Sequence, residues 1–217
     1  MQQADSAQRK KISLTAFFTS MDIITVKVGI LQTNCYILKQ GGKAVVIDPG
    51  AKVQRIVDAL GESQVLAILL THGHFDHIGA LNDLLAVVSV PVYLNPEDEP
   101  LLKDSQLNYS FPKRFTVDAP TKPYPVNLEL GPFKFEVIDS SGHTEGSVML
   151  KIGDHLFSGD TLFKLSVGRT DLKTGNPTAM KQTLRSIKSL HGPLTIWPGH
   201  EEPTTLEDEL NQNPYLR

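Results

Sequence analysis

The stretch Thr71-His72-Gly73-His74-Phe75-Asp76-His77-Ile78-Gly79 puts four potential metal ligands, three imidazoles and one carboxylate, into six consecutive positions. Such a run is poorly suited to an apolar core, and it persists most naturally where divalent cations hold the side chains together. Three of the seven histidines of the chain fall in this stretch, which argues against a solvated polar loop. Because Gly73 permits a tight turn, the imidazoles on either side of it can aim at one point. The stretch therefore predicts a metal site.

The segments on either side of this stretch predict a strand and a helix. The apolar run Val65–Leu70 is typical of a buried strand, because it is short and rich in branched side chains. After the stretch, the apolar residues at 78, 81, 84, 85 and 88 have the spacing of one helical face. We therefore expect the ligands to lie on a strand-to-helix loop, in the crevice beyond the strand ends where sites are usually built.

Composition and charge exclude several partners. A chain of 217 residues with 40% hydrophobic content can bury a full core. Its net charge of -3 and pI near 6.2 give no basic surface for nucleic acid or an anionic membrane. No apolar run approaches the roughly 18 residues that span a bilayer, so we expect a soluble protein. The single cysteine, Cys35, suits a reducing compartment and hence the cytoplasm, and its apolar setting favours a buried inert thiol over a nucleophile.

The periodic pattern divides the chain into a leader over residues 1 to 21 and a single domain over residues 22 to 217. The leader is polar, and its short apolar part lacks the cleavage site of a signal peptide, so we expect it to be disordered. After it come strands, helices, strands and helices, with a hairpin signal at Gln40-Gly41-Gly42-Lys43. This order predicts an α/β fold, a four-layer αββα sandwich of two mixed sheets flanked by helices.

Several local patterns give sharper expectations. Asn95 caps a helix over about 96 to 104, and Asn176-Pro177 caps another that runs to about Leu190. Residues 105 to 125 contain four prolines and no clear period, which is typical of a long ordered loop that binds or covers a site. Thr204 to Glu207 has the pattern of a capping box for a final helix that Asn213-Pro214 stops.

Three further turns each offer a metal-binding side chain directly after a glycine: Gly142-His143, Gly159-Asp160 and Gly199-His200. Each turn is a weak signal alone, but together with the first stretch they complete a set of seven ligands. Asp48 ends the apolar strand Ala44–Ile47 just before a Pro-Gly turn. It is either a local turn former or a partner that orients a metal-bound histidine, and the two interpretations are compatible.

With these residues the chain resembles the metallo-beta-lactamase fold superfamily, and within it the small glyoxalase II-like (hydroxyacylglutathione hydrolase-like) hydrolases, over roughly residues 22 to 217. The resemblance implies one metal held by His72, His74 and His143, a second held by Asp76, His77 and His200, and Asp160 bridging both. His155 and His191 match no motif position and are interpreted as ordinary surface or strand-end residues.

The resemblance to glyoxalase II-like enzymes implies hydrolysis of a small-molecule thioester or related carboxylic ester, and a pair of metals can supply the chemistry for it. Two cations that share a carboxylate can share a water and lower its pKa from about 15.7 towards roughly 7, so that a bridging hydroxide becomes the nucleophile. Asp76 is the expected catalytic residue, since it would bind a metal and orient the hydroxide. We expect two divalent ions, zinc first, with iron or manganese as alternatives. The sequence does not determine the oligomeric state.

Arg169 lies in a glycine-containing turn nine residues after Asp160. Its guanidinium is a candidate for a two-pronged contact with a substrate carboxylate. The alternative for this residue is a structural salt bridge to Asp171.

Other functions compete with the hydrolase. Persulfide dioxygenases of the same superfamily bind one iron through the equivalents of His72, His143 and Asp160, and share a segment like Gly168-Arg169-Thr170-Asp171, which also occurs in short glyoxalase II-like hydrolases. Glyoxalase II enzymes carry a further C-terminal helical region with glutathione contacts that this sequence lacks after its last ligand, so we do not expect glutathione specificity. Beta-lactamase activity is less favoured, because Asp160 stands where the commonest zinc enzymes have cysteine. A flavodiiron-like redox module and a nuclease are disfavoured, because we find no flavin-type domain and no nucleic-acid domain in this sequence.

Overall fold

The computed structural model describes residues 20–217, so nearly all of the leader expected over residues 1 to 21 lies outside the described residues. Within residues 20–217, no helix has both the length and the apolar character needed to cross a membrane.

The first half of the domain builds a mixed six-stranded sheet in the order β1-β2-β3-β4-β5-β6. The first three strands are antiparallel and the rest are parallel. The strands are β1 (Asp22–Val28), β2 (Thr33–Gln40), β3 (Lys43–Ile47), β4 (Gln64–Leu69), β5 (Val92–Tyr93) and β6 (Thr121–Lys122). The helices of this half are α1 (Val53–Leu60), α2 (Phe75–Ile78), α3 (Leu81–Val87), a 3-10 turn η1 (Pro96–Asp98) and α4 (Glu99–Lys103).

The second half builds another six-stranded sheet in the order β14-β13-β10-β9-β8-β7, in which only β10 and β13 run parallel. Its strands are β7 (Asn127–Leu130), β8 (Phe133–Asp139), β9 (Val148–Ile152), β10 (His155–Gly159), β13 (Thr195–Pro198) and β14 (Thr204–Thr205). A separate hairpin pairs β11 (Leu162–Phe163) with β12 (Ser166–Val167), and the helices are α5 (Pro177–Ile187) and α6 (Leu206–Gln212).

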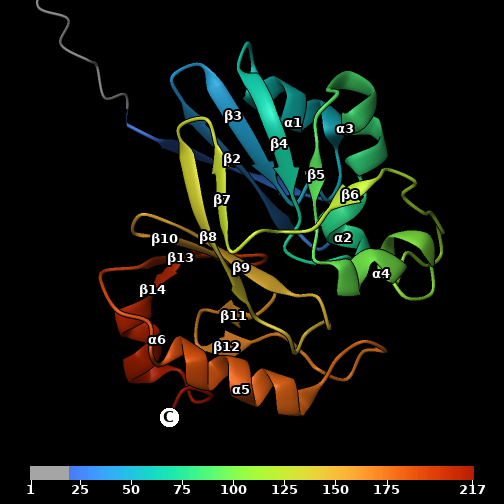
Figure 1. Ribbon diagram of the computed structural model, residues 1–217. Helices are drawn as coiled ribbons and strands as arrows, with labels where there is room; N and C mark the ends of the chain where they lie inside the picture. Colours follow the sequence, from blue (N-terminus) through green and yellow to red (C-terminus); the bar gives the residue numbers. More distant parts are fainter. Residues whose placement is uncertain (1–19) are drawn as a thin grey trace, which may run out of the picture.

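Alternation of side chains along the strands creates the layers. On β2, Cys35 and Ile37 join the cluster that packs under α1 and α3, whereas Tyr36 and Leu38 join the cluster between the two sheets. A third cluster, which includes Met180, joins the second sheet to α5 and α6. Figure 1 shows the resulting order of helices, sheet, sheet and helices. The predicted four-layer αββα sandwich is confirmed.

Four local predictions were wrong in detail. The helix after the histidine stretch begins at Phe75 and breaks after Ile78, so Asp76 and His77 lie in a helical turn, not in a loop. The break follows from packing: a Cβ on Gly79 would lie 2.4 Å from the carbonyl oxygen of Gly50, and the amide of Ala80 donates to Pro49. Neighbouring backbone therefore fixes the end of this turn.

The other three differences concern one short strand and the ends of two helices. Strand β6 interrupts the predicted loop over residues 105 to 125, and it pairs with β5 at the edge of the first sheet. The last helix is capped by Thr205, whose hydroxyl accepts a hydrogen bond from the amide of Asp208, so the capping box lies one residue later than predicted. Helix α5 is capped by Asn176 as predicted, but it ends at Ile187.

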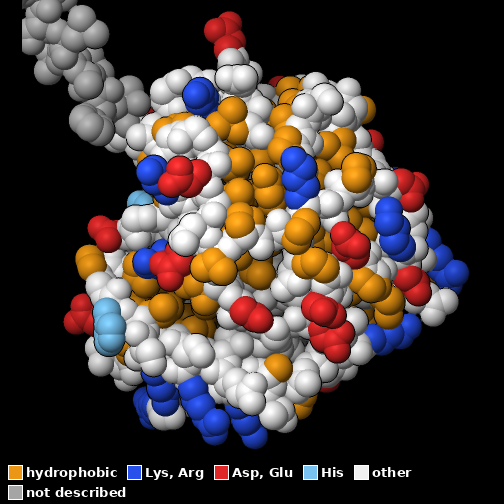
Figure 2. All heavy atoms as spheres, in the orientation of Figure 1, with side chains coloured by type: hydrophobic (Ala, Val, Ile, Leu, Met, Phe, Trp, Pro, Cys, Tyr) orange, Lys and Arg blue, Asp and Glu red, His pale blue; other side chains and the backbone are white. Residues whose placement is uncertain are grey.

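The face of the molecule drawn in Figure 2 carries hydrophobic side chains through its centre, with acidic and basic side chains interspersed around them, and basic side chains gather along its lower edge and on its right side. In Figure 1 helix α5 lies along the lower edge, and its exposed residues include Lys181 and Arg185.

Candidate metal centre

Seven side chains from both halves of the domain converge at one edge of the sandwich. His72 and His74 follow β4, and Asp76 and His77 lie on α2. His143 stands between β8 and β9, Asp160 directly follows β10, and His200 follows β13. The tertiary structure thus brings together all seven ligands that the sequence predicts, and their role in binding metal stays a prediction.

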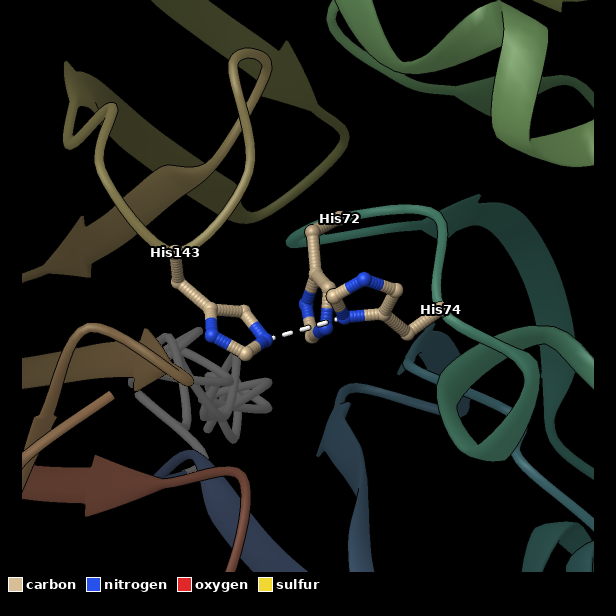
Figure 3. Close-up of side chains that lie close together, drawn as sticks. All are labelled: His72, His74 and His143. Carbon is tan, nitrogen blue, oxygen red and sulfur yellow. Dashed lines mark hydrogen bonds between the residues drawn. The ribbon is translucent and has the colours of Figure 1, made fainter. Parts of the chain in front are cut away.

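The first group of ligands is His72, His74 and His143. All three are buried, and their ligand atoms lie within 4.8 Å of one another. Figure 3 shows the imidazoles from the two halves facing each other, with Nδ1 of His74 and Nε2 of His143 only 2.9 Å apart. Three imidazoles whose ligand atoms lie this close together form a set that divalent transition metals prefer.

The second group is Asp76, His77 and His200, whose ligand atoms also lie within 4.8 Å of one another. Nε2 of His200 is 3.2 Å and Nε2 of His77 is 3.5 Å from the same Asp76 oxygen, Oδ2. This group mixes one carboxylate with two imidazoles, a second combination that suits a divalent cation.

Asp160 lies between the two groups. One of its carboxylate oxygens, Oδ1, is 3.3 Å from His77, and the other, Oδ2, is 3.6 Å from His143 and 3.4 Å from His200. A carboxylate that faces ligands of both groups is placed where a bridging ligand is needed.

Several buried polar atoms in this cluster have no hydrogen-bond partner among the described residues. They are Nε2 of His72, His74 and His77, and Oδ1 of Asp160. Buried polar atoms are almost always paired, so an unpaired group of them calls for an explanation such as a bound ion. The residues present therefore fit a divalent metal.

The charges of the site support the same interpretation. Burial keeps the pKa of His72 well below its ordinary value and lowers that of His74 to about 3, so both imidazoles are neutral. Burial acts in the same direction on His200, but hydrogen bonds to Asp160 and Asp76 outweigh it and raise its pKa to about 10. The carboxylates of Asp76 and Asp160 are therefore stabilised by positive charge beside them, which metal ions would supply.

Asp48 orients one of the ligands from outside the cluster. Its Oδ2 lies 2.9 Å from Nδ1 of His77, and its two oxygens accept hydrogen bonds from the amide and hydroxyl of Thr71 at 2.8 and 2.6 Å. Although Asp48 also lies within 4.8 Å of ligand atoms of His72 and His77, its oxygens already have these partners. The geometry favours the predicted orienting role.

Two backbone carbonyls hold further imidazoles in the same way. Nδ1 of His143 donates to the carbonyl of Arg169 at 2.8 Å, and Nδ1 of His200 donates to the carbonyl of Leu31 at 3.2 Å. A histidine whose Nδ1 is fixed presents Nε2 as the ligand atom. The site is therefore oriented before any metal binds.

Sequence reasoning missed Asp98, which falls inside the helix expected over about 96 to 104. Its side chain is fully buried and accepts hydrogen bonds from the amide of Gly73 at 2.9 Å, the hydroxyl of Thr144 at 2.8 Å and the amide of Gly146 at 2.8 Å. Burial raises the pKa of Asp98, and these three bonds oppose the rise. Asp98 thus joins the His72–His74 segment to the His143 segment.

The glycines that precede the ligands are required by close packing. A Cβ on Gly199 would lie 2.1 Å from Oδ1 of Asp160, and Gly159 has φ +50° with the hydroxyl of Thr71 2.5 Å from the position of a Cβ. Side chains at these positions would displace the site.

Two remaining predictions concern Cys35 and Arg169. Cys35 is a free, fully buried thiol whose pKa burial raises well above its ordinary value, as expected for an inert cysteine. The guanidinium of Arg169 makes two hydrogen bonds of 2.7 Å to the carboxylate of Asp171, which is the alternative named for it. Contact of Arg169 with a substrate stays a prediction.

Comparison with protein families and curated sequences identifies relatives along most of the chain. A model of the metallo-beta-lactamase superfamily matches residues 28–200. A probable metallo-hydrolase of Bacillus subtilis (strain 168) is 37% identical over 206 residues, which cover 87% of this chain and 94% of the relative. The hydroxyacylglutathione hydrolase GloC of Haemophilus influenzae is 30% identical over 210 residues, which cover 90% of this chain and 98% of the relative.

Solved structures agree with these relatives. The B3 metallo-beta-lactamase BLEG-1 is 36% identical with a TM-score of 0.85, over 90% of this chain and 99% of that one. The protein TTHA1623, solved in a di-iron-bound form, is also 36% identical, with a TM-score of 0.81 over 89% of this chain and 100% of that one.

Proposed function

The chain belongs to the metallo-beta-lactamase superfamily, and from that premise we propose that it is a metal-dependent hydrolase of a small-molecule thioester or related carboxylic ester. The observation that carries the proposal is the set of unpaired buried atoms of His72, His74, His77 and Asp160 inside one cluster of seven ligands. The similarity to a hydroxyacylglutathione hydrolase supports a thioester, because that relative is named for an acylated thiol.

Two divalent ions fit the ligands better than one. Seven ligands exceed what one ion uses, and a single ion would leave buried charged groups uncompensated. We propose zinc as the first choice, with iron as the main alternative because a relative binds two irons. When bound, the ions would supply a water of lowered pKa and a Lewis acid for the attacked carbonyl.

The protein's own residues do the positioning. The hydroxyl of Thr33 donates to Oδ2 of Asp76 at 2.8 Å and so fixes the carboxylate that orients the attacking water. Asp48 and the carbonyl of Arg169 hold His77 and His143, so the ligands need little reorganisation. We place the reaction in the cytoplasm, where the free thiol of Cys35 would stay reduced.

The first experiment measures metal content and substrate class together. Protein made without added metal and then loaded with zinc, iron or manganese is expected to bind about two ions per chain and to hydrolyse thioesters. Elemental analysis and a panel of thioesters, a persulfide and a beta-lactam would measure this. The beta-lactam is included because BLEG-1 is 36% identical. One iron per fully active chain, with turnover of the persulfide alone, would overturn the proposal in favour of a sulfur oxygenase.

A separate prediction concerns Arg169. Its ion pair with Asp171 is exposed, with side-chain exposures of 63% and 68%, and exposed pairs add little stability. The guanidinium can therefore exchange Asp171 for a substrate carboxylate at small cost. Arg169→Ala should lower kcat/KM for carboxylate-bearing thioesters by about tenfold. The kcat/KM for neutral thioesters should change much less.

Metal content and melting temperature should stay unchanged in this variant. Asp171→Asn is the matched control, because it removes the protein partner but leaves the guanidinium. Equal losses on charged and neutral thioesters, or a loss that follows the melting temperature, would assign Arg169 to the scaffold.

A further inference from the structure

A groove of about 530 Å³ opens beside Asp76, between the turn that joins β1 to β2 and the loop that follows α4. Its walls are mostly apolar and include Ile30, Leu31, Phe111 and Phe115. Small-molecule sites occupy roughly 300–1,000 Å³ and are lined mainly by hydrophobic and aromatic side chains. Size and lining therefore match a ligand site that is continuous with the metal centre.

Three large hydrophobic side chains of the groove are strongly exposed to solvent. Ile30 is 89%, Phe111 77% and Leu31 49% exposed, and all three line the same groove. The other exposed large hydrophobic residues in the described part of the chain, Val87, Val126, Leu165 and Tyr215, lie elsewhere. Apolar side chains that gather on a surface mark a place where something apolar binds.

The turn on one side of the groove is anchored to the metal centre. The carbonyl of Leu31 accepts from Nδ1 of His200, and the hydroxyl of Thr33 donates to Asp76. The base of the turn is thus fixed by two predicted ligands, while Ile30 projects from its tip. A ligand that contacts Ile30 therefore lies at a defined distance from the reacting centre.

The loop on the other side is anchored in a similar way. The amide of Phe75 donates to the carbonyl of Asn108 at 2.9 Å. The side chain of Asn108 donates to the carbonyl of Phe115 at 3.2 Å, and the amide of Phe115 donates to the hydroxyl of Ser110 at 3.1 Å. These bonds close the base of the loop next to Asp76, and Phe111 stands at its exposed tip.

We propose that this groove binds the acyl chain of the substrate, so that the enzyme prefers thioesters with extended apolar acyl groups. The proposal rests on the proposed hydrolase function and names its substrate class. Thiol carriers are polar and often charged, whereas the groove offers one cation, Lys113, and two carboxylates, Asp76 and Asp83, among apolar walls. The acyl chain is the part of a thioester that gains free energy from such walls.

The test uses the metal-loaded enzyme and one thiol, N-acetylcysteamine, with acetyl, butyryl and hexanoyl groups. Each methylene that the groove buries should raise kcat/KM by about fourfold. Hexanoyl has four more methylenes than acetyl, so burial of even two of them should give a hexanoyl-to-acetyl ratio of kcat/KM of at least about tenfold. In the double variant Ile30→Asp, Phe111→Ser this ratio should fall to near one. Val126→Ser is the matched control, since Val126 is 72% exposed but lies outside the groove, and it should keep the ratio.

A second measurement does not depend on turnover. Calorimetric titration with hexanoate should show tighter binding and a more negative heat-capacity change in the wild type and in Val126→Ser than in the double variant. Equal kcat/KM for all three thioesters, or a hexanoyl-to-acetyl ratio that is unchanged in the double variant, would contradict binding of the acyl chain in the groove. The proposed hydrolase activity would not be contradicted by either result. If hexanoate binds in the wild type and more weakly in the double variant, but no thioester is hydrolysed, the proposed hydrolase activity would be contradicted. The same result would support the groove as a site for an apolar chain.

Discussion

Replacing Asp160 with alanine is expected to abolish metal binding at one position or both and to lower kcat by about a thousandfold or more. The reason is its place between the two ligand groups, with Oδ1 3.3 Å from His77 and Oδ2 3.6 Å from His143. Without this carboxylate, neither group is linked to the other. Elemental analysis of the purified variant and its activity on the best thioester would measure both effects.

Two controls separate metal loss from unfolding. Asp160→Asn keeps the volume and one oxygen but loses the charge, and it should bind metal more weakly than the wild type. Asp154→Ala removes an exposed acid before β10 and should change neither metal content nor turnover. An Asp160→Ala protein that retains two ions and full activity would show that this carboxylate does not bridge.

Replacing Asp98 with alanine is expected to destabilise the fold and weaken metal binding together. The change leaves the amides of Gly73 and Gly146 and the hydroxyl of Thr144 without their acceptor. Unpaired buried donors cost about 1–3 kcal/mol each, so we expect a loss of about 3 kcal/mol or more. For a domain of this size, the melting temperature should fall by roughly 6–12 °C.

Metal affinity should fall by about 10- to 100-fold, because groups that hold ligand segments in place have effects of this size. Calorimetric metal titration below the melting transition would measure the affinity apart from stability. Asp98→Asn keeps one acceptor and should show a smaller loss, and Glu97→Ala, at an exposed neighbouring position, should show none. Unchanged affinity in a folded Asp98→Ala protein would limit Asp98 to a role in stability.

The sequence determined the layer architecture because its patterns are local. The apolar run Cys35–Leu38 predicts a strand, and because successive side chains of a strand point to opposite faces, Cys35 and Tyr36 reach clusters on opposite faces of one sheet. Helix ends were less well determined. At the break after Ile78, the amide of Ala80 donates to the carbonyl of Pro49, which lies far away in the sequence.

The seven candidate ligands could be named from sequence because four of them occur within six positions and the others each follow a glycine. The grouping into two sets came from the family resemblance, and the structure places the side chains in a matching arrangement. Asp98 could not be found in this way. Its position next to Asn95 and Pro96 is also that of an ordinary acid at a helix start, and its partners are as many as 48 residues away.

What the sequence by itself determined about this protein is therefore the set of candidate ligand residues and the order of strands and helices that builds two sheets between helices. Only the tertiary structure decided which carboxylates face the cluster and which stand behind it, as Asp48 and Asp98 do. It also decided that Ile30 and Phe111, some 80 positions apart, line one groove. The physical reason is that hydrogen bonds and apolar contacts between distant segments depend on how the layers stack, and no local spacing in the chain encodes that geometry.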